Sequence, residues 1–449
     1  MSVAPSSTSK AVAWVPCRGW FSGEPHDGPA WIGVADGRIS AISATRPQRG
    51  DVVRDGAALY AAPLLADAHV HVYMQPWPID PARRVPPGSK PFEDEVEDAI
   101  ARVDAALASG VGLLRDFGDP LGINIEVKRR LAHRGTPAPK MLVCGPGFHR
   151  PKKYGRFIGV ARETIADICA SIDELHRRGQ IDFVKLVTTG IVDFANRRVT
   201  QSPQFTVEEL SRVVGHAHEL GYKVASHCSG EDGIDINLAA GVDFLEHGYF
   251  IREGQIDRMI EKRIAWTPTL APVYVQGIHD EATWAPEVRR NIDSILRDHA
   301  ARIAYAIRRG ATVLVGTDAG SPGVEMGCGM RIELERLAAA GMAADELLRM
   351  ATVGNAAAIG YEAYAPALQV GAAASFALYE HCPWRDIRNL NSLRHLFIAG
   401  ERVNSPSPIP MGEGRGEGSS TSGSCAQSVK NPHPSPLPEY REREIGSNK

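Results

Sequence analysis

The chain has 449 residues, of which 43% are hydrophobic and 23% charged, as in ordinary globular proteins. A net charge of −3 without a basic stripe argues against nucleic acid or an anionic membrane as partner, and no apolar run approaches the roughly 18 residues of a membrane helix. The N-terminus does not resemble a secretory signal. Seven scattered cysteines without a CxxC pair are typical of reduced thiols. We therefore expect a cytoplasmic protein that acts on a small molecule, with homo-oligomerisation left open.

Both ends of the chain have strand-like patterns. WIGVADGRISAIS (31–43) alternates around Asp36-Gly37, a preferred pair for hairpin turns. Near the other end, QVGAAASFALYE (369–380) and HLFIAGERV (395–403) again read as strands. We expect residues 1–62 and 364–403 to pair in one small β-domain, a β-sandwich.

Residues 63–363 alternate short apolar runs with amphipathic stretches, which predicts βα units and a parallel sheet. The candidate strands are 64–71, 111–118, 140–147, 183–190, 223–228, 244–250, 265–270 and 312–320. Helices are expected at 91–110 and 206–221, with a closing helix at 346–360. Eight such units predict an α/β fold of the (β/α)8 or TIM barrel type, and a doubly wound open sheet is the alternative.

The last segment, 404–449, is rich in Pro, Gly, Ser and charged residues and poor in residues able to form a core. Such low-complexity composition predicts a disordered tail.

Polar residues recur at or near the C-terminal ends of the predicted strands, the rim that carries catalytic groups in such barrels. They are His69, His71, Lys185, His227, His247 and Asp318. Taken singly, a histidine in an apolar run is usually structural, and Asp318 could cap a helix. Lys185 is harder to dismiss, because burying an unpaired ammonium costs several kcal/mol. All six together favour a functional site.

The spacing of His69 and His71 decides whether they can share a metal ion. Residues two apart on a strand point to the same face, so this pair can. A second HxH pair, His216 and His218, lies in a predicted helix, where residues two apart point about 200° apart. Four histidines, a carboxylate and a lysine suit Zn²⁺ or a similar ion, and six groups imply two ions or one ion with catalytic groups. Lys185 could bridge two ions as an anionic carbamate formed from its uncharged amine and CO₂.

The order of these residues, HxH on the first strand, Lys on the fourth, His on the fifth and sixth and Asp on the eighth, resembles the amidohydrolase superfamily from about residue 30 to 403. GVDFLEHGYF, VLVGTDAG and ATVGNAAAIG resemble its branch with imidazolonepropionase, prolidase-like dipeptidases and ochratoxinase-like amidases.

The resemblance implies two divalent ions, taken as Zn²⁺. His69, His71 and Asp318 would bind one ion, His227 and His247 the other, and carboxylated Lys185 would bridge them. It also implies hydrolysis of an amide, of a dipeptide or an N-acyl amino acid, by a metal-bridging hydroxide with Asp318 as general base and then acid.

Two features bear on the alternatives and on the substrate. Mononuclear deaminases of the superfamily carry a Glu at the position of Gly230, so a mononuclear zinc deaminase is the alternative, together with a cyclic amide or lactone hydrolase. A metal-free scaffold is a third possibility, disfavoured by the complete ligand set. In the loop GPGFHRPKKYGRF (145–157), His149 and Tyr154 are candidate substrate-binding residues, and this basic, aromatic loop would suit a free carboxylate. An ordinary solvated surface loop explains the same residues equally well.

Overall fold

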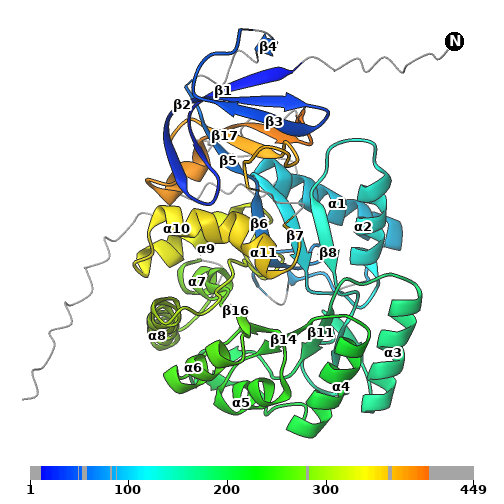
Figure 1. Ribbon diagram of the computed structural model, residues 1–449. Coiled ribbons are helices and arrows are strands. Elements are labelled where there is room, and N and C mark those ends of the chain that lie inside the picture. The colour runs from blue at the N-terminus through cyan, green and yellow to red at the C-terminus, as the bar shows by residue number, and fades with distance from the viewer. Residues whose placement is uncertain are drawn as a thin grey trace, which may run out of the picture. The chain divides into compact units, whose positions relative to one another are not determined.

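The computed structural model describes residues 12–48, 50–52, 58–80, 83–86, 88–279, 283–362 and 367–403 (Figure 1). Helices alternate with parallel strands through most of this range, so the predicted α/β class is confirmed. The stretch 404–449, predicted to be disordered, lies outside the described residues.

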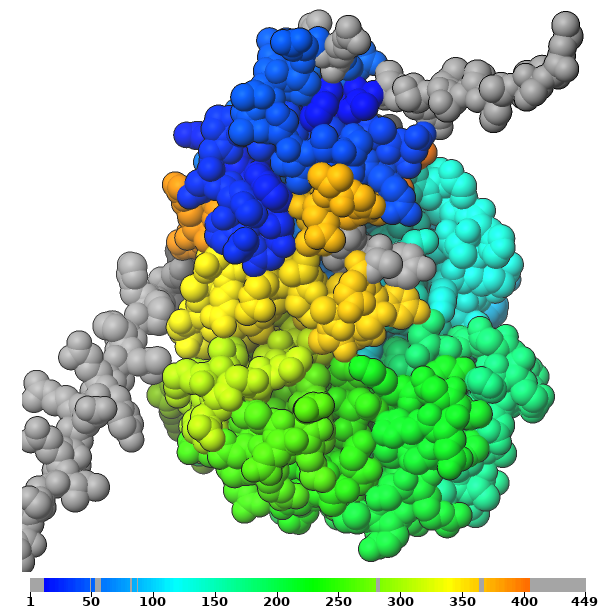
Figure 2. Space-filling view, in the orientation of Figure 1, coloured from blue at the N-terminus to red at the C-terminus, as the bar shows by residue number. Residues whose placement is uncertain are grey.

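Strands from both ends of the chain form one sheet in the order β19-β18-β17-β5-β1-β2-β3, with β4 paired to β1. Their bounds are Ala13–Phe21 (β1), Pro25–Ala35 (β2), Arg38–Ser43 (β3), Asp51–Val52 (β4), Tyr60–Pro63 (β5), Phe376–Tyr379 (β17), Leu393–Ile398 (β18) and Glu401–Val403 (β19). Asp36 and Gly37 both have positive φ, as the predicted hairpin turn requires. The antiparallel β5–β17 pair joins the two ends, whose blue and orange segments lie together in Figure 2. Strands from the two ends of the described chain therefore pair within one sheet.

A second set of strands is mainly parallel and forms the groups β6-β7-β8 and β10-β9-β11-β14-β15-β16. The first group comprises Leu65–Val70 (β6), Val111–Asp116 (β7) and Lys140–Val143 (β8). The second comprises Gly147–His149 (β9), Gly159–Ala161 (β10), Val184–Val187 (β11), Val224–Cys228 (β14), Phe244–His247 (β15) and Ala265–Thr267 (β16). A separate hairpin, Val192–Asp193 (β12) with Arg198–Val199 (β13), follows β11. Each of the first seven strands predicted in this region overlaps one of these.

The eighth predicted strand, 312–320, is the exception, because it forms isolated bridges instead of a continuous strand. It still lies between β16 and β6: the amide of Leu314 donates to the carbonyl of Trp266 at 2.8 Å, and that of Asp318 to the carbonyl of His69 at 2.7 Å. A side chain replaces one of the backbone acceptors of a regular strand pair, since Asp67 accepts a hydrogen bond from the Thr317 amide at 3.0 Å. The segment is thus fixed against β6 without regular strand pairing.

Helices follow most of the parallel strands and pack against them (Figure 1). They are Phe92–Ala108 (α1), Ile123–His133 (α2), Ile165–Arg177 (α3), Val207–Glu219 (α4), Glu231–Ala240 (α5), Glu253–Glu261 (α6), Leu270–Ile278 (α7), Pro286–Arg308 (α8), Cys328–Ala339 (α9), Ala344–Arg349 (α10) and Asn355–Ala358 (α11). A π-helical turn, Met350–Gly354, joins α10 to α11, and a 3-10 helix spans Ile387–Ser392. The helices predicted at 91–110 and 206–221 are α1 and α4, and α4 begins with a capping box between Thr206 and Glu209.

The predicted closing helix, 346–360, is present as α10, the π turn and α11. Its Asn355 side chain accepts a hydrogen bond from the Val315 amide at 3.0 Å and donates to the carbonyl of Ala66 at 2.7 Å. Asn355 therefore holds the 312–320 segment beside β6.

Every residue of β6, β7, β11, β14, β15 and β16 is buried. This is expected of parallel strands covered on both faces. The polar residues that these strands carry are consequently buried too, and each needs a partner or a function. No helix among the described residues is long and apolar enough to cross a membrane.

Candidate metal centre

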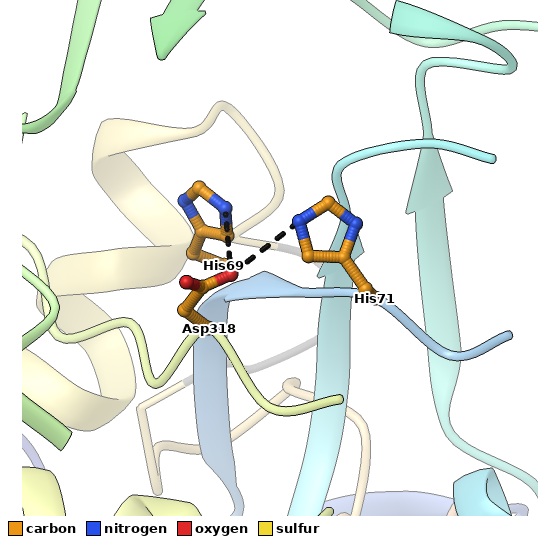
Figure 3. Close-up of side chains that lie close together, drawn as sticks. All are labelled: His69, His71 and Asp318. Atoms are coloured by element: carbon orange, nitrogen blue, oxygen red, sulfur yellow. Dashed lines mark ion pairs between the residues drawn. The ribbon is translucent and has the colours of Figure 1, made fainter. Parts of the chain in front are cut away.

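His69, His71 and Asp318 converge on one point, as Figure 3 shows. His69 lies on β6, His71 directly follows it, and Asp318 comes from the irregular segment beside it. One ligand atom from each lies within 4.8 Å of the others, and Asp318 Oδ1 is 3.5 Å from His69 Nε2 and 3.4 Å from His71 Nε2. The strand geometry predicted for the HxH pair is therefore present.

Hydrogen bonds to the opposite ring nitrogens set the direction of both imidazoles. The Nδ1 of His69 lies 2.7 Å from Glu246 Oε2, and that of His71 lies 3.1 Å from the carbonyl of Gly118. Both partners accept, so each Nδ1 carries a hydrogen and each Nε2 keeps a free lone pair. Within the described part of the chain, the buried Nε2 of His69 has no hydrogen-bond partner.

His227 and His247 form a second pair beside the first. Their ring centroids are 4.5 Å apart, and the centroids of His247 and His69 are 5.0 Å apart. His247, at the end of β15, has a left-handed φ of 67° and makes a 2.7 Å hydrogen bond through Nδ1 to Thr269 Oγ1. His227 approaches the carbonyl of Gly190 through Nε2 at 3.3 Å, which leaves the lone pair of Nδ1 free to bind a metal ion. These two rings do not belong to the compact group of ligand atoms formed by His69, His71 and Asp318.

Lys185 is the second of the four residues of β11, deeper than a position at the end of the strand. It is fully buried, and its Nζ has no hydrogen-bond partner within the described ranges. Burial lowers its pKa to about 8. The side chain lines the same cavity as His227, His247 and Asp318, so it extends from this deeper level to the site.

Protonation states in the site match those that metal binding requires. Burial, helped by the charge of Lys185, holds the pKa of His69 well below its usual range and lowers that of His227 to about 3. Burial, with neighbouring His227, likewise keeps the pKa of His247 far below normal. Burial alone would raise the pKa of Asp318, but the proximity of His71 and His69 outweighs it, and the pKa falls. The site at pH 7 thus offers neutral imidazoles and an ionised carboxylate.

These observations fit a divalent ion. A buried ring nitrogen without a partner, a carboxylate within 3.5 Å of it and oriented imidazoles form the nitrogen and oxygen donor set that zinc and similar ions prefer.

The site opens into a cavity of about 870 Å³. Tyr154 and Arg156 from the predicted substrate-binding loop line it, and the Tyr154 ring lies 5.1 Å from that of His227. His149 is buried, donates from Nδ1 to the Arg150 carbonyl at 2.9 Å, and is not among the residues that line the cavity. The loop therefore brings Tyr154 to the site more directly than His149.

Comparison with known proteins identifies the family. The profile of the Amidohydrolase family matches residues 60–403. The chain belongs to the amidohydrolase family. It is a metal-dependent amidohydrolase, as the resemblance in the sequence implies.

Similar proteins cover much of this amidohydrolase. An uncharacterised protein of Mycobacterium bovis is 31% identical over 331 residues, which is 73% of this chain and 80% of that protein. The ochratoxinase of Aspergillus niger is 26% identical over 207 residues, 45% of this chain and 42% of that protein. The crystal structure of a Xaa-Pro dipeptidase with bound methionine superposes with a TM-score of 0.74 at 22% identity, over 88% of this chain and 100% of that one. At this identity the structural likeness establishes the fold.

Sequence reasoning missed Glu246 and Arg115 in this amidohydrolase. Glu246 is fully buried, accepts the hydrogen bond of His69 and lies 3.8 Å from Arg115 Nη1 through its other oxygen. The Arg115 guanidinium lies against three phenylalanine rings, the nearest at 4.0 Å. Arg115 and Glu246 could have been recognised from the sequence, because each is a charged residue inside an apolar run, VGLLRDFG and FLEHGYF.

Proposed function

We propose that this amidohydrolase uses two divalent ions, taken as Zn²⁺, to hydrolyse an amide bond in a dipeptide or an N-acyl amino acid. The observation that carries the proposal is two neighbouring pairs of buried histidines beside Lys185, whose Nζ has no hydrogen-bond partner among the described residues. His69 and His71 would hold one ion with Asp318, while His227 and His247 would hold the other. Carboxylated Lys185 would bridge the two ions, and the absence of any other hydrogen-bond partner for Nζ in the described structure supports that role.

We infer that the parallel strands close into a (β/α)8 barrel over residues 63–363. The hydrogen bonds of the 312–320 segment to β16 on one side and β6 on the other support closure there. On the far side, the Asp182 amide donates to the carbonyl of Val143 at 2.8 Å, which supports a junction between β8 and β11. Residues 1–62 and 364–403 would form the small β-domain, with its sheet folded as a sandwich.

Asp318 is the proposed proton-transfer group. When bound, the ions would lower the pKa of water towards neutrality and polarise the scissile carbonyl. The ionised Asp318 carboxylate, partly buried beside both histidines of the first pair, accepts a proton and returns it to the departing nitrogen. Ser321 Oγ donates to Asp318 Oδ2 at 3.0 Å, which fixes the carboxylate with Oδ1 directed at the histidines.

Tyr154 and Arg156 are the proposed contacts to the substrate. Arg156 is exposed, lines the cavity and makes no ion pair with the other described residues, so its guanidinium is available for a carboxylate. Burial and the charge of Asp318 raise the pKa of Tyr154, which keeps its hydroxyl protonated as a donor. A free carboxylate on the amino-acid half of the substrate would suit both groups. His149 would contribute indirectly, by holding the loop through its hydrogen bond to the Arg150 carbonyl.

The geometry around Gly230 disfavours the deaminase alternative. Its φ is 81°, and a Cβ added there would lie 2.6 Å from the Val199 side chain. The next residue, Glu231, lies 3.4 Å from exposed Arg252 and is not among the residues lining the cavity. A proton shuttle from this position would therefore require a different loop conformation.

A cytoplasmic location is part of the same proposal, and it rests on the free cysteines. Among the described residues, Cys17, Cys144, Cys169, Cys228 and Cys382 form no disulfide.

Metal analysis combined with a substrate panel tests the proposed function. Protein purified without chelator should contain close to two ions per chain and should hydrolyse dipeptides or N-acyl amino acids. Chelation should remove this turnover and Zn²⁺ should restore it. One ion per chain with ammonia release from a heterocycle would favour the deaminase, and turnover restricted to cyclic amides or lactones would favour that alternative. Protein without bound metal would overturn the proposal.

A further inference from the structure

One side of the cavity is an apolar wall that the amide chemistry does not require. It consists of Ile191, Val192, Phe194, Val273 and Trp284, which all line the cavity. Ile191 is 44% exposed and Trp284 is 38% exposed, and with Val85 they account for three of the seven large hydrophobic residues exposed in the described structure. Large apolar side chains gathered at a cavity mark a binding surface more often than isolated exposed ones do.

Hydrogen bonds hold this wall in place. The side chain of Asn291, on α8, donates to the carbonyls of Phe194 at 3.0 Å and Ala195 at 3.1 Å. The Trp284 indole donates to Gln276 Oε1 at 3.3 Å, and the Phe194 and Trp284 rings meet edge to face with centroids 5.6 Å apart. The wall is therefore formed before any ligand binds, which limits the entropy lost on binding.

The wall continues directly into the proposed metal site. Val273 lies on α7, whose first residue follows Thr269, and the Thr269 hydroxyl contacts His247 at 2.7 Å. The Tyr249 hydroxyl donates to the Thr269 carbonyl at 3.0 Å, and Tyr249 packs with Val273 in one apolar cluster. A group lying on the wall would thus be attached close to the scissile bond.

The cavity lining also includes the charged Arg156, which is not part of the apolar wall. Arg156 lies in the same loop as Tyr154, whose ring lies 5.1 Å from that of His227, whereas the five wall residues carry no charge. Asp193, which lies between Val192 and Phe194, is engaged by the Asn196 amide and side chain at 3.1 and 2.8 Å. If the carboxylate of the substrate lies at Arg156, the acyl half is left for the apolar wall.

We propose that the acyl half of the substrate is a bulky, uncharged aromatic group that lies on the wall formed by Ile191, Val192, Phe194, Val273 and Trp284. This inference rests on the proposed function and narrows it from dipeptides to N-aroyl amino acids. A cavity of about 870 Å³ lies in the upper part of the range for drug-sized ligands, which matches a ring system better than a short dipeptide.

The test compares acyl groups on a constant amino acid with the Zn²⁺-loaded enzyme. N-acetyl-, N-benzoyl- and N-(2-naphthoyl)-L-alanine differ only in the part that would meet the wall. The value of kcat/KM should rise along this series, by roughly tenfold or more from acetyl to naphthoyl. Trp284→Ala should reduce the naphthoyl-to-acetyl ratio by about tenfold, and Trp284→Phe should retain most of it. Phe92→Ala, which removes an exposed aromatic ring on α1 outside the cavity lining, is the matched control and should leave the ratio unchanged.

A binding measurement separates this inference from the proposed function. Calorimetric titration with 2-naphthamide, a neutral ligand, should give binding to the wild type that weakens about tenfold in Trp284→Ala. Binding of 2-naphthamide that depends on Trp284, without hydrolysis of any N-acyl amino acid, would refute the proposed function and would support the wall as a binding surface for aromatic groups. Hydrolysis with no preference among the three acyl groups, or a preference that Trp284→Ala leaves intact, would overturn the inference while the proposed function survives.

Discussion

Replacing Glu246 by glutamine would remove one charge from the buried support of the metal site while keeping its size. Glu246 is fully buried, with Oε2 2.7 Å from His69 Nδ1 and Oε1 3.8 Å from Arg115 Nη1. Burial lowers the pKa of Arg115 to about 10 and Glu246 acts in the opposite direction, so Arg115 is charged at pH 7. Glu246→Gln would therefore leave a buried cation without its carboxylate.

Two effects of known size follow. Removing one partner of a buried ion pair destabilises a fold by about 3–5 kcal/mol, because the remaining charge keeps its desolvation penalty. Removing the carboxylate that orients a metal-binding histidine lowers metal affinity by about 10–100-fold. The double variant Arg115→Met/Glu246→Gln should recover most of the free energy of unfolding, since the stranded cation is gone. It should not recover metal affinity, because His69 still lacks the carboxylate.

The assay measures the two effects separately. Urea melts of chelator-treated protein give the free energy of unfolding without metal, and competition with a chromogenic chelator gives Zn²⁺ affinity. Glu325→Gln is the matched control, since Glu325 accepts a 2.6 Å hydrogen bond from Trp77 outside the metal group and its loss should leave Zn²⁺ affinity unchanged. Unaltered Zn²⁺ affinity in Glu246→Gln, or recovery of affinity in the double variant, would refute a positioning role for Glu246.

Three further outcomes are expected. Asp318→Asn should keep the fold, as judged by circular dichroism, but lower kcat by about 10²–10⁴-fold through loss of the proton-transfer group; near-normal turnover would exclude that role. The pKa of Lys185 is lowered to about 8, so its uncharged fraction is about fifty times larger at pH 8 than at pH 6. Zn²⁺ reconstitution of chelated protein at constant dissolved CO₂ should therefore be faster at pH 8 than at pH 6. A reconstitution rate that does not depend on pH would contradict carbamate formation on Lys185. His216→Ala and His218→Ala remove contacts to Asp173 and Asp243 that are at least partly exposed, so bound zinc should be unchanged and the free energy of unfolding should fall by less than about 1 kcal/mol. Loss of zinc from either variant would contradict the argument that an HxH pair on a helix cannot share a metal ion.

Periodicity sufficed for much of the fold and for the HxH pair. Alternation along β6 predicts that His69 and His71 share a face, and both lie within 3.5 Å of Asp318. The segment 312–320 was predicted as a regular strand but is irregular, because the side chains of Asp67 and Asn355 accept backbone hydrogen bonds that a neighbouring strand would otherwise accept. Such replacement depends on contacts between residues far apart in the sequence, and no local pattern encodes it.

The residues around Lys185 show what a charge inventory of the buried strands adds to periodicity. Among the described parallel strands, Asp67 is paired with Thr317 and Asp116 accepts amide hydrogens from Val72 and Gly118. Arg115 and Glu246 neutralise each other at 3.8 Å. Lys185 remains as the charged side chain whose polar atom has neither a hydrogen bond nor an ion pair among the described residues, although burying an ammonium costs several kcal/mol. Conversion of the amine to an anion that binds metal would remove this cost, so the buried position of Lys185 supports its proposed bridging role more directly than any histidine does.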